Sequence, residues 1–135
     1  MSDLTQLYSD FVAAYKDNPV AFVRFVLNAE PLPWQQDLMN AVARGERRIS
    51  VRAAHGVGKS TCCSWILLWT LMTKMPQKAV VTAPTASQLF DALFSELRHW
   101  ANKMPQPLLD TIEIFSDRIV HKGAPESSFI SVRIS

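Results

Sequence analysis

The chain has 135 residues, the size of a single domain. Apolar residues make up 48% and charged residues 19%, a balance that excludes disorder as the main state of the chain. The 14 basic and 12 acidic residues leave a net charge of +2. This charge is too small to indicate a nucleic-acid-binding protein by itself, but it is compatible with a local basic face.

Cysteine usage and the N-terminal sequence both bear on the compartment of the protein. Cys62 and Cys63 are adjacent, so they seldom bridge, and the chain has no CxxC or Cys/His spacing that favours a zinc site. The first residues, MSDLTQLYSD, lack the basic and apolar regions of a signal peptide. The most apolar run, Cys62–Met72, is too short to span a bilayer. We therefore expect a protein of the reduced cytoplasm that has no membrane anchor.

The first third of the chain reads as helical. Apolar residues recur at helical spacing, and prolines interrupt the pattern where one helix should give way to the next. The expected helices are Leu4–Lys16, then Val20–Asn28 with Asn18 and Pro19 at its start, and finally Trp34–Arg44 with Gly45 as its C-cap.

From Arg47 onward, strand-like and helical segments alternate. Such alternation predicts an α/β unit with a parallel sheet flanked by helices. The chain then becomes β-rich, and two short runs that meet near Ser116 and Asp117 predict a hairpin. The expected strands are Arg47–Ala53, Lys78–Ala83, Thr111–Phe115, Arg118–Lys122 and Ser128–Ile134, and the expected helices are Lys59–Lys74 and Ala86–Lys103.

The segment AAHGVGKS at 53–60 carries the strongest functional signal. It matches G-x-x-x-x-G-K-[ST] except that Ala53 replaces the first glycine, and it lies between an expected strand and an expected helix. Glycines allow the backbone to approach a phosphate closely, and the helix N-terminus attracts the anion. Lys59 can reach the β- and γ-phosphates, and Ser60 can hold Mg²⁺. The expected nucleotide contacts are His55, Gly56, Val57, Gly58, Lys59, Ser60 and Thr61.

Two residues of this region, one within the loop and one just before it, each leave two interpretations open. His55 is either an ordinary loop histidine or a donor to the γ-phosphate. Arg52 is either a solvated residue at a strand end or a cation close to the phosphates. Both are therefore candidates for an accessory catalytic role only.

Two further segments can line a nucleotide site. The amide of Gln35 can both donate to and accept from the Hoogsteen edge of adenine, and Trp34 beside it can pack on the base. The alternative is an ordinary helix start with a half-buried tryptophan. At the end of the second strand, Thr82, Pro84 and Thr85 either line the site or form a simple turn.

Together these motifs resemble the N-terminal ATPase domain of phage terminase large subunits, the motors that package DNA. The resemblance lies in PWQQDL at 33–38, RAAHGVGKS at 52–60 and VVTAPTASQ at 80–88, and in SFISVRIS at 128–135, which is similar to the strand before Walker B. It implies a P-loop NTPase fold of the ASCE type over residues 31–135, preceded by a helical segment over residues 1–30.

The resemblance also implies functional roles. Gln35 corresponds to the adenine-reading glutamine, Lys59 and Ser60 to the Walker A lysine and hydroxyl, and Thr82, Pro84 and Thr85 to a segment that couples nucleotide state to DNA. The implied cofactors are ATP and Mg²⁺. The implied partners are double-stranded DNA, a terminase small subunit, a portal protein and further copies of the same chain, in the cytoplasm of a host cell.

The carboxylates of the family's catalytic half have no counterpart here. Walker B requires four apolar residues before its aspartate, and Asp110, Glu113 and Asp117 all lack them. Nor is there a cluster of carboxylates for the metal ions of a nuclease domain. We therefore expect the first half of an ATPase domain. Two alternatives are a prophage remnant without catalysis and another P-loop ATPase such as a helicase.

Contact with DNA has weaker support in the residues themselves. Arg118, Lys122 and Arg133 with His121 form one basic group, and Arg44, Arg47 and Arg48 form another. Either group can meet phosphates without base specificity, or can simply be a solvated basic face.

Overall fold

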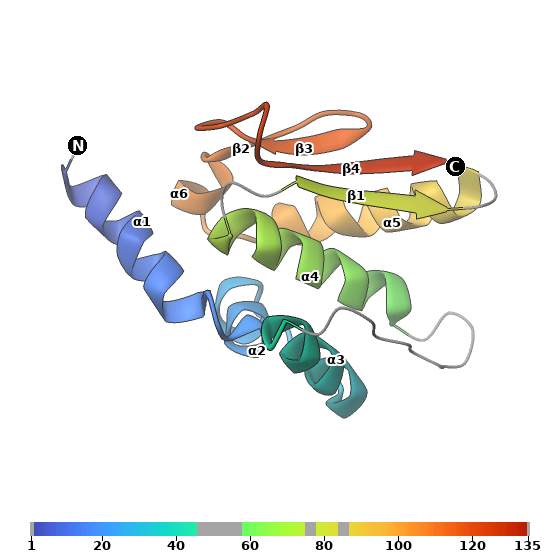
Figure 1. The fold of residues 1–135 in the computed structure, drawn as a ribbon, viewed down its shortest axis with the longest axis horizontal. Helices are drawn as coiled ribbons and strands as arrows, with labels where there is room; N and C mark the ends of the chain where they lie inside the picture. The colour runs from blue at the N-terminus through green and yellow to red at the C-terminus, as the bar shows by residue number, and fades with distance from the viewer. Residues whose placement is uncertain (1, 46–57, 75–77, 84–86, 135) are drawn as a thin grey trace.

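The computed structural model describes residues 2–45, 58–74, 78–83 and 87–134, which pack as helices against a four-stranded sheet (Figure 1). The strands are ordered β1-β4-β3-β2 across the sheet. β1 pairs with β4 in parallel, whereas β4 with β3 and β3 with β2 pair antiparallel. The bounds of the strands are Lys78–Ala83 for β1, Ile112–Ile114 for β2, Arg118–His121 for β3 and Phe129–Ile134 for β4.

The sheet is therefore mixed rather than wholly parallel in the described residues. The predicted hairpin around Ser116 is confirmed, since Ile112 pairs with His121 and Ile114 with Ile119. The connection from β3 to β4 spans only residues 122–128, and a parallel crossover needs a dozen residues or more, so these two strands must run antiparallel. The strand expected over Arg47–Ala53 lies outside the described residues, so its place in the sheet stays a prediction.

The five expected helices all lie close to their predicted positions. The structure differs in two places, at the second helix and at a short helix, α6, that was not expected. The second helix was expected as a single α-helix over Val20–Asn28. It is instead a short α2 followed by a π-helical turn, η1, and it ends where Asn28 adopts a positive φ of 56°. Asparagine tolerates this left-handed conformation better than most residues. The helices are α1 Ser2–Tyr15, α2 Pro19–Ala21, η1 Phe22–Val26, α3 Pro33–Ala43, α4 Lys59–Thr73, α5 Ser87–Ala101 and α6 Gln106–Leu109.

The predicted caps are also present. The side chain of Asn18 accepts a hydrogen bond from the backbone N–H of Ala21 at 3.1 Å, and Pro19 occupies the first turn of α2. Gly45 follows α3 with a φ of 84° and donates its N–H to the carbonyl of Val42 at 3.0 Å. The short α6 differs from the prediction, because Pro107 does not break a helix here but lies in the first turn of α6, where proline is well tolerated.

The core forms around α4. This helix is apolar on nearly every side, and its residues Leu68, Leu71 and Met72 are fully buried. One side of α4 packs against α5, and the core continues to the isoleucines of the sheet. The N-terminal helices cover another side, where Phe22 and Leu27 are fully buried. No helix in the described part of the chain combines the length and the apolarity needed to cross a membrane.

Helix α1 is attached to the core by hydrogen bonds as well as by aromatic packing. The indole N–H of Trp69 donates to the carbonyl of Tyr15 at 2.6 Å. The hydroxyl of Tyr8 donates to the carbonyl of Met72 at 2.8 Å and lies 3.1 Å from Nε2 of His121. Tyr8 therefore joins three elements, α1, the end of α4 and β3, at one point.

These contacts determine which nitrogen of His121 carries the proton. The single Tyr8 hydroxyl proton is directed at Met72, so Nε2 of His121 must donate to the Tyr8 oxygen. Nδ1 is then free to accept the backbone N–H of Gly123, which lies at 3.2 Å. Protonation of Nδ1 would place two N–H groups against each other. In addition, burial lowers the pKa of His121 from its usual value.

We expect the protein to lose stability on acidification because His121 is held neutral. Its pKa is lower in the folded chain than in the unfolded chain, so its contribution is fully present above about pH 6.5. That contribution is lost as the pH falls through the folded-state value. Urea unfolding measures the free energy of unfolding at about pH 7.5 and at about pH 5. Between these two pH values, that free energy should fall less for His121→Gln than for the unaltered chain. An equal drop in both proteins would contradict this assignment.

Candidate nucleotide-binding site

Four elements have an end toward the same end of the molecule. The parallel strands β1 and β4 both finish there, and α4 and α5 both begin there (Figure 1). In open α/β sheets, ligands bind beyond the carboxyl ends of the parallel strands. The phosphate loop predicted from sequence leads directly into α4, so its described end lies toward this end of the molecule.

Gly58 is the described end of that loop and the N-cap of α4. It has a φ of 68°, in the left-handed region that glycine adopts at little cost. Gly58 has no side chain that could cap the start of α4, and no cap from another described side chain is present there. The helix has 15 residues and begins with Lys59 and Ser60, and its first N–H groups have no partner within the helix. Such an end carries a partial positive charge and suits a phosphate.

The structure brings Gln35 to this point from 23 residues away in the sequence. Its Oε1 accepts the backbone N–H of Leu32 at 2.8 Å, and its Nε2 donates to the carbonyl of Gly58 at 3.1 Å. The same carbonyl accepts the first helical hydrogen bond of α4, from Cys62 at 3.0 Å. Gln35 therefore ties the start of α3 to the start of α4.

The fit between Gln35 and Gly58 is close. A Cβ atom added at Gly58 would lie 2.7 Å from Nε2 of Gln35 and 3.6 Å from Cζ2 of Trp34. Both residues predicted to contact the base thus lie against the end of the phosphate loop, and the position requires glycine both for its φ and for its lack of a side chain.

Burial restricts what the Gln35 amide can do. The residue is only 3% exposed, and both ends of its amide already have backbone partners. The oxygen can accept one more hydrogen bond and the nitrogen has one more hydrogen to donate. Gln35 can therefore read a base only if the nucleotide approaches beside Gly58 or if the side chain leaves Leu32. In the described arrangement its direct effect is to position the loop.

Ser60 and Thr61 occupy the first turn of α4 and are both half-buried. The Thr61 carbonyl accepts the hydroxyl of Ser64 at 2.6 Å. Among the described residues, no group of three or more His, Cys, Asp or Glu side chains could hold a metal ion. A single hydroxyl at this position fits Mg²⁺ that is held mainly by the phosphates of a nucleotide.

Several predicted site residues fall where the structure offers no test. For Lys59 and Thr82 only the backbone is described, at the first residue of α4 and near the end of β1. Their predicted roles stay predictions. The remaining candidates lie outside the described residues altogether, and these are Arg52, His55, Gly56, Val57, Pro84 and Thr85.

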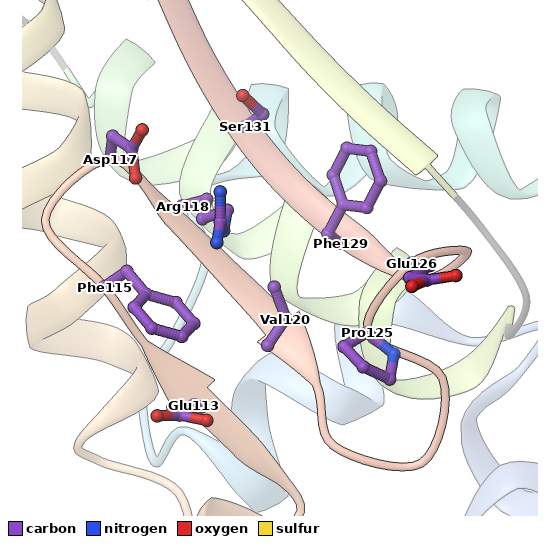
Figure 2. A pocket seen from close by; sticks show the side chains of 9 residues that line it. All are labelled: Glu113, Phe115, Asp117, Arg118, Val120, Pro125, Glu126, Phe129 and Ser131. Carbon is purple, nitrogen blue, oxygen red and sulfur yellow. The ribbon is translucent and has the colours of Figure 1, made fainter.

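Two described members of the basic group predicted around β3, Arg118 and His121, do not share a basic face, and the side chain of Arg133 lies outside the described residues. His121 is buried against Tyr8. The guanidinium of Arg118 lies over the ring of Phe115, 4.8 Å from its centroid, and the hollow beside it is lined by three carboxylates (Figure 2). Sequence reasoning missed this hollow, although the period-2 alternation of the strand residues was the signal that could have located it.

Comparison with known proteins adds no assignment, since no family model, curated protein or solved structure matches the chain.

We expect Gly58→Ala to cost more stability than Gly45→Ala. Both glycines have a positive φ, which costs roughly 1–2 kcal/mol for an alanine. Only at Gly58 does the added Cβ meet a side chain, whereas nothing lies within 4 Å at Gly45. Urea unfolding measures both losses.

The Gln35→Ala background provides the control for this pair. There the excess loss at Gly58 should disappear, because the atom that the new Cβ meets has been removed. Equal losses at the two glycines, or an excess that persists without Gln35, would show that Gln35 does not pack on the loop.

Proposed function

We propose that this chain is the ATP-binding portion of a DNA-packaging ATPase that resembles terminase large subunits. The observation that carries the proposal is the junction of Gln35 with Gly58. Two motifs predicted separately from sequence, PWQ and GKS, meet at the amino end of α4, which lies toward the same end of the molecule as the carboxyl ends of a parallel strand pair.

The proposed roles follow from the chemistry of each residue. Lys59 supplies a cation to the β- and γ-phosphates, and Ser60 supplies a hydroxyl to Mg²⁺. The N–H groups in the first turn of α4, which the side chain of its N-cap residue does not cap, are proposed to face the phosphates. Gln35 holds Gly58 in place and, with Trp34, lies on the side from which adenine would be recognised.

Hydrolysis requires groups that these residues do not supply. A Walker B aspartate would complete the Mg²⁺ shell, and a glutamate would activate the attacking water. We found no segment of that pattern within the 135 residues, so we propose nucleotide binding without turnover by this chain alone. DNA, a small subunit, a portal protein and further copies of the chain are proposed partners on the family resemblance alone.

We expect Lys59→Ala to abolish binding of a fluorescent ATP analogue in the presence of Mg²⁺. Removal of the phosphate-binding cation should weaken the complex by more than about tenfold, since hydrogen bonds to charged groups contribute about 1.5–3 kcal/mol. Lys103→Ala is the matched control, because Lys103 is exposed in the turn after α5. Equal affinity of Lys59→Ala and Lys103→Ala would contradict the phosphate-loop assignment, as would a folded chain that binds no nucleotide.

We expect Gln35→Ala to weaken ATP binding more than GTP binding. Gln36→Ala is the control, because Gln36 is the next residue and its amide donates to the carbonyl of Pro31 at 3.0 Å, away from Gly58. Competition titrations with both nucleotides separate two roles for Gln35. A selective loss of affinity for ATP supports recognition of adenine by Gln35. An equal loss of affinity for both nucleotides would show that Gln35 only positions Gly58.

A further inference from the structure

One face of the sheet is left uncovered by the described helices. Ile112, Ile119 and Ile130 face the core that α4 and α5 form on one side. Side chains alternate along each strand, so the residue next to each of these isoleucines points to the opposite face of the sheet. In Figure 1, α4 and α5 lie on the same side of the strands, and no described helix lies across the other side.

The uncovered face holds a groove of about 430 Å³, a volume within the range of known ligand sites. A row of paired residues crosses its floor, from Glu113 on β2 through Val120 on β3 to Phe129 on β4. Val120 lies at the centre of the group in Figure 2, with Phe115 and Phe129 on either side. The middle of the groove is therefore apolar.

Carboxylates flank this apolar centre. Figure 2 shows Glu113 on one side of Val120 and Glu126, from the loop between β3 and β4, on the other. Both are exposed, and no ion pair engages either one within the described ranges. Asp117 adds a third carboxylate, against the single guanidinium of Arg118. The lining is thus predominantly anionic, and lining of this sign repels nucleic acid.

We propose that this groove binds an extended cationic segment of a partner protein, with the pattern basic-x-apolar-x-basic. In an extended chain, alternate side chains point the same way and are about 7 Å apart. An apolar side chain over Val120 and Phe129 therefore has basic neighbours that point at the carboxylates on both sides. This charge complementarity selects the occupant, and it does not depend on the proposed nucleotide site.

The test is a fluorescence anisotropy titration with labelled peptides. The probe is lysine-serine-leucine-serine-lysine between glycines. One comparison peptide replaces both lysines by glutamate, and another replaces leucine by serine. We expect saturable binding of the first peptide only. Glu113→Lys combined with Glu126→Lys should weaken that binding by at least about tenfold, because like charges placed together across an interface are strongly unfavourable.

The matched control is Asp17→Lys combined with Asp91→Lys, which changes the net charge by the same amount at exposed positions that do not line the groove. This protein should bind the probe as the unaltered chain does, and circular dichroism should show all proteins folded. An equal loss in the control, equal binding of the glutamate or serine peptide, or no saturable binding would overturn the proposal. So would a groove-dependent dimer in light scattering, which would make a second copy the occupant.

Discussion

The apolar surface of α4 is the constraint on which the rest of the structure depends. A helix that is apolar on nearly every side is stable in water only if other elements cover it, and each large side chain that is buried contributes about 1.5–3 kcal/mol. The sheet together with α5 covers one side of α4, and the N-terminal helices cover another side. Hydrogen bonds then attach the N-terminal cover at both ends, through Tyr8 and Trp69 near the end of α4 and through Gln35 at its start.

Covering α4 also positions its amino end. The backbone of Gly58 is in the left-handed region, and its carbonyl accepts hydrogen bonds from the backbone N–H of Cys62 and from the amide of Gln35. The direction in which the chain enters the helix is therefore restricted. The same contact restricts Gln35 as a recognition group, since burial and two backbone partners leave its amide one hydrogen bond to accept and one to donate. The residue that sequence reasoning selected for base recognition thus has a structural effect on the phosphate loop as well, and the two effects are separable by experiment.

The two faces of the sheet differ in chemistry for a simple reason. Alternation along β2, β3 and β4 places the isoleucines on one face, against α4 and α5. The other face receives a mixed row, in which Val120 and Phe129 lie beside Glu113. The apolar centre is poorly solvated and the anionic flanks repel DNA. We therefore connect this face with a cationic partner rather than with the proposed DNA substrate.

Much of the local structure was predictable from sequence, because periodicity, caps and breakers act over a few residues. The helices around Trp34–Arg44 and Lys59–Lys74, the strand Lys78–Ala83 and the hairpin at Ser116 all agree with prediction within a few residues. The π-helical turn was not predictable, because the same apolar pattern suits an α-helix and only packing around Phe22–Val26 separates the two.

The sequence by itself determined the GKS segment, the glutamine upstream of it and the apolar character of α4. Only the tertiary structure decided that Gln35 packs on Gly58, that β3 and β4 run antiparallel, and that His121 is neutral beneath Tyr8. Each of these depends on groups that are 9 to 113 residues apart in the chain. Contacts over such separations arise from burial of the shared core, and no local pattern encodes which partners that burial brings together.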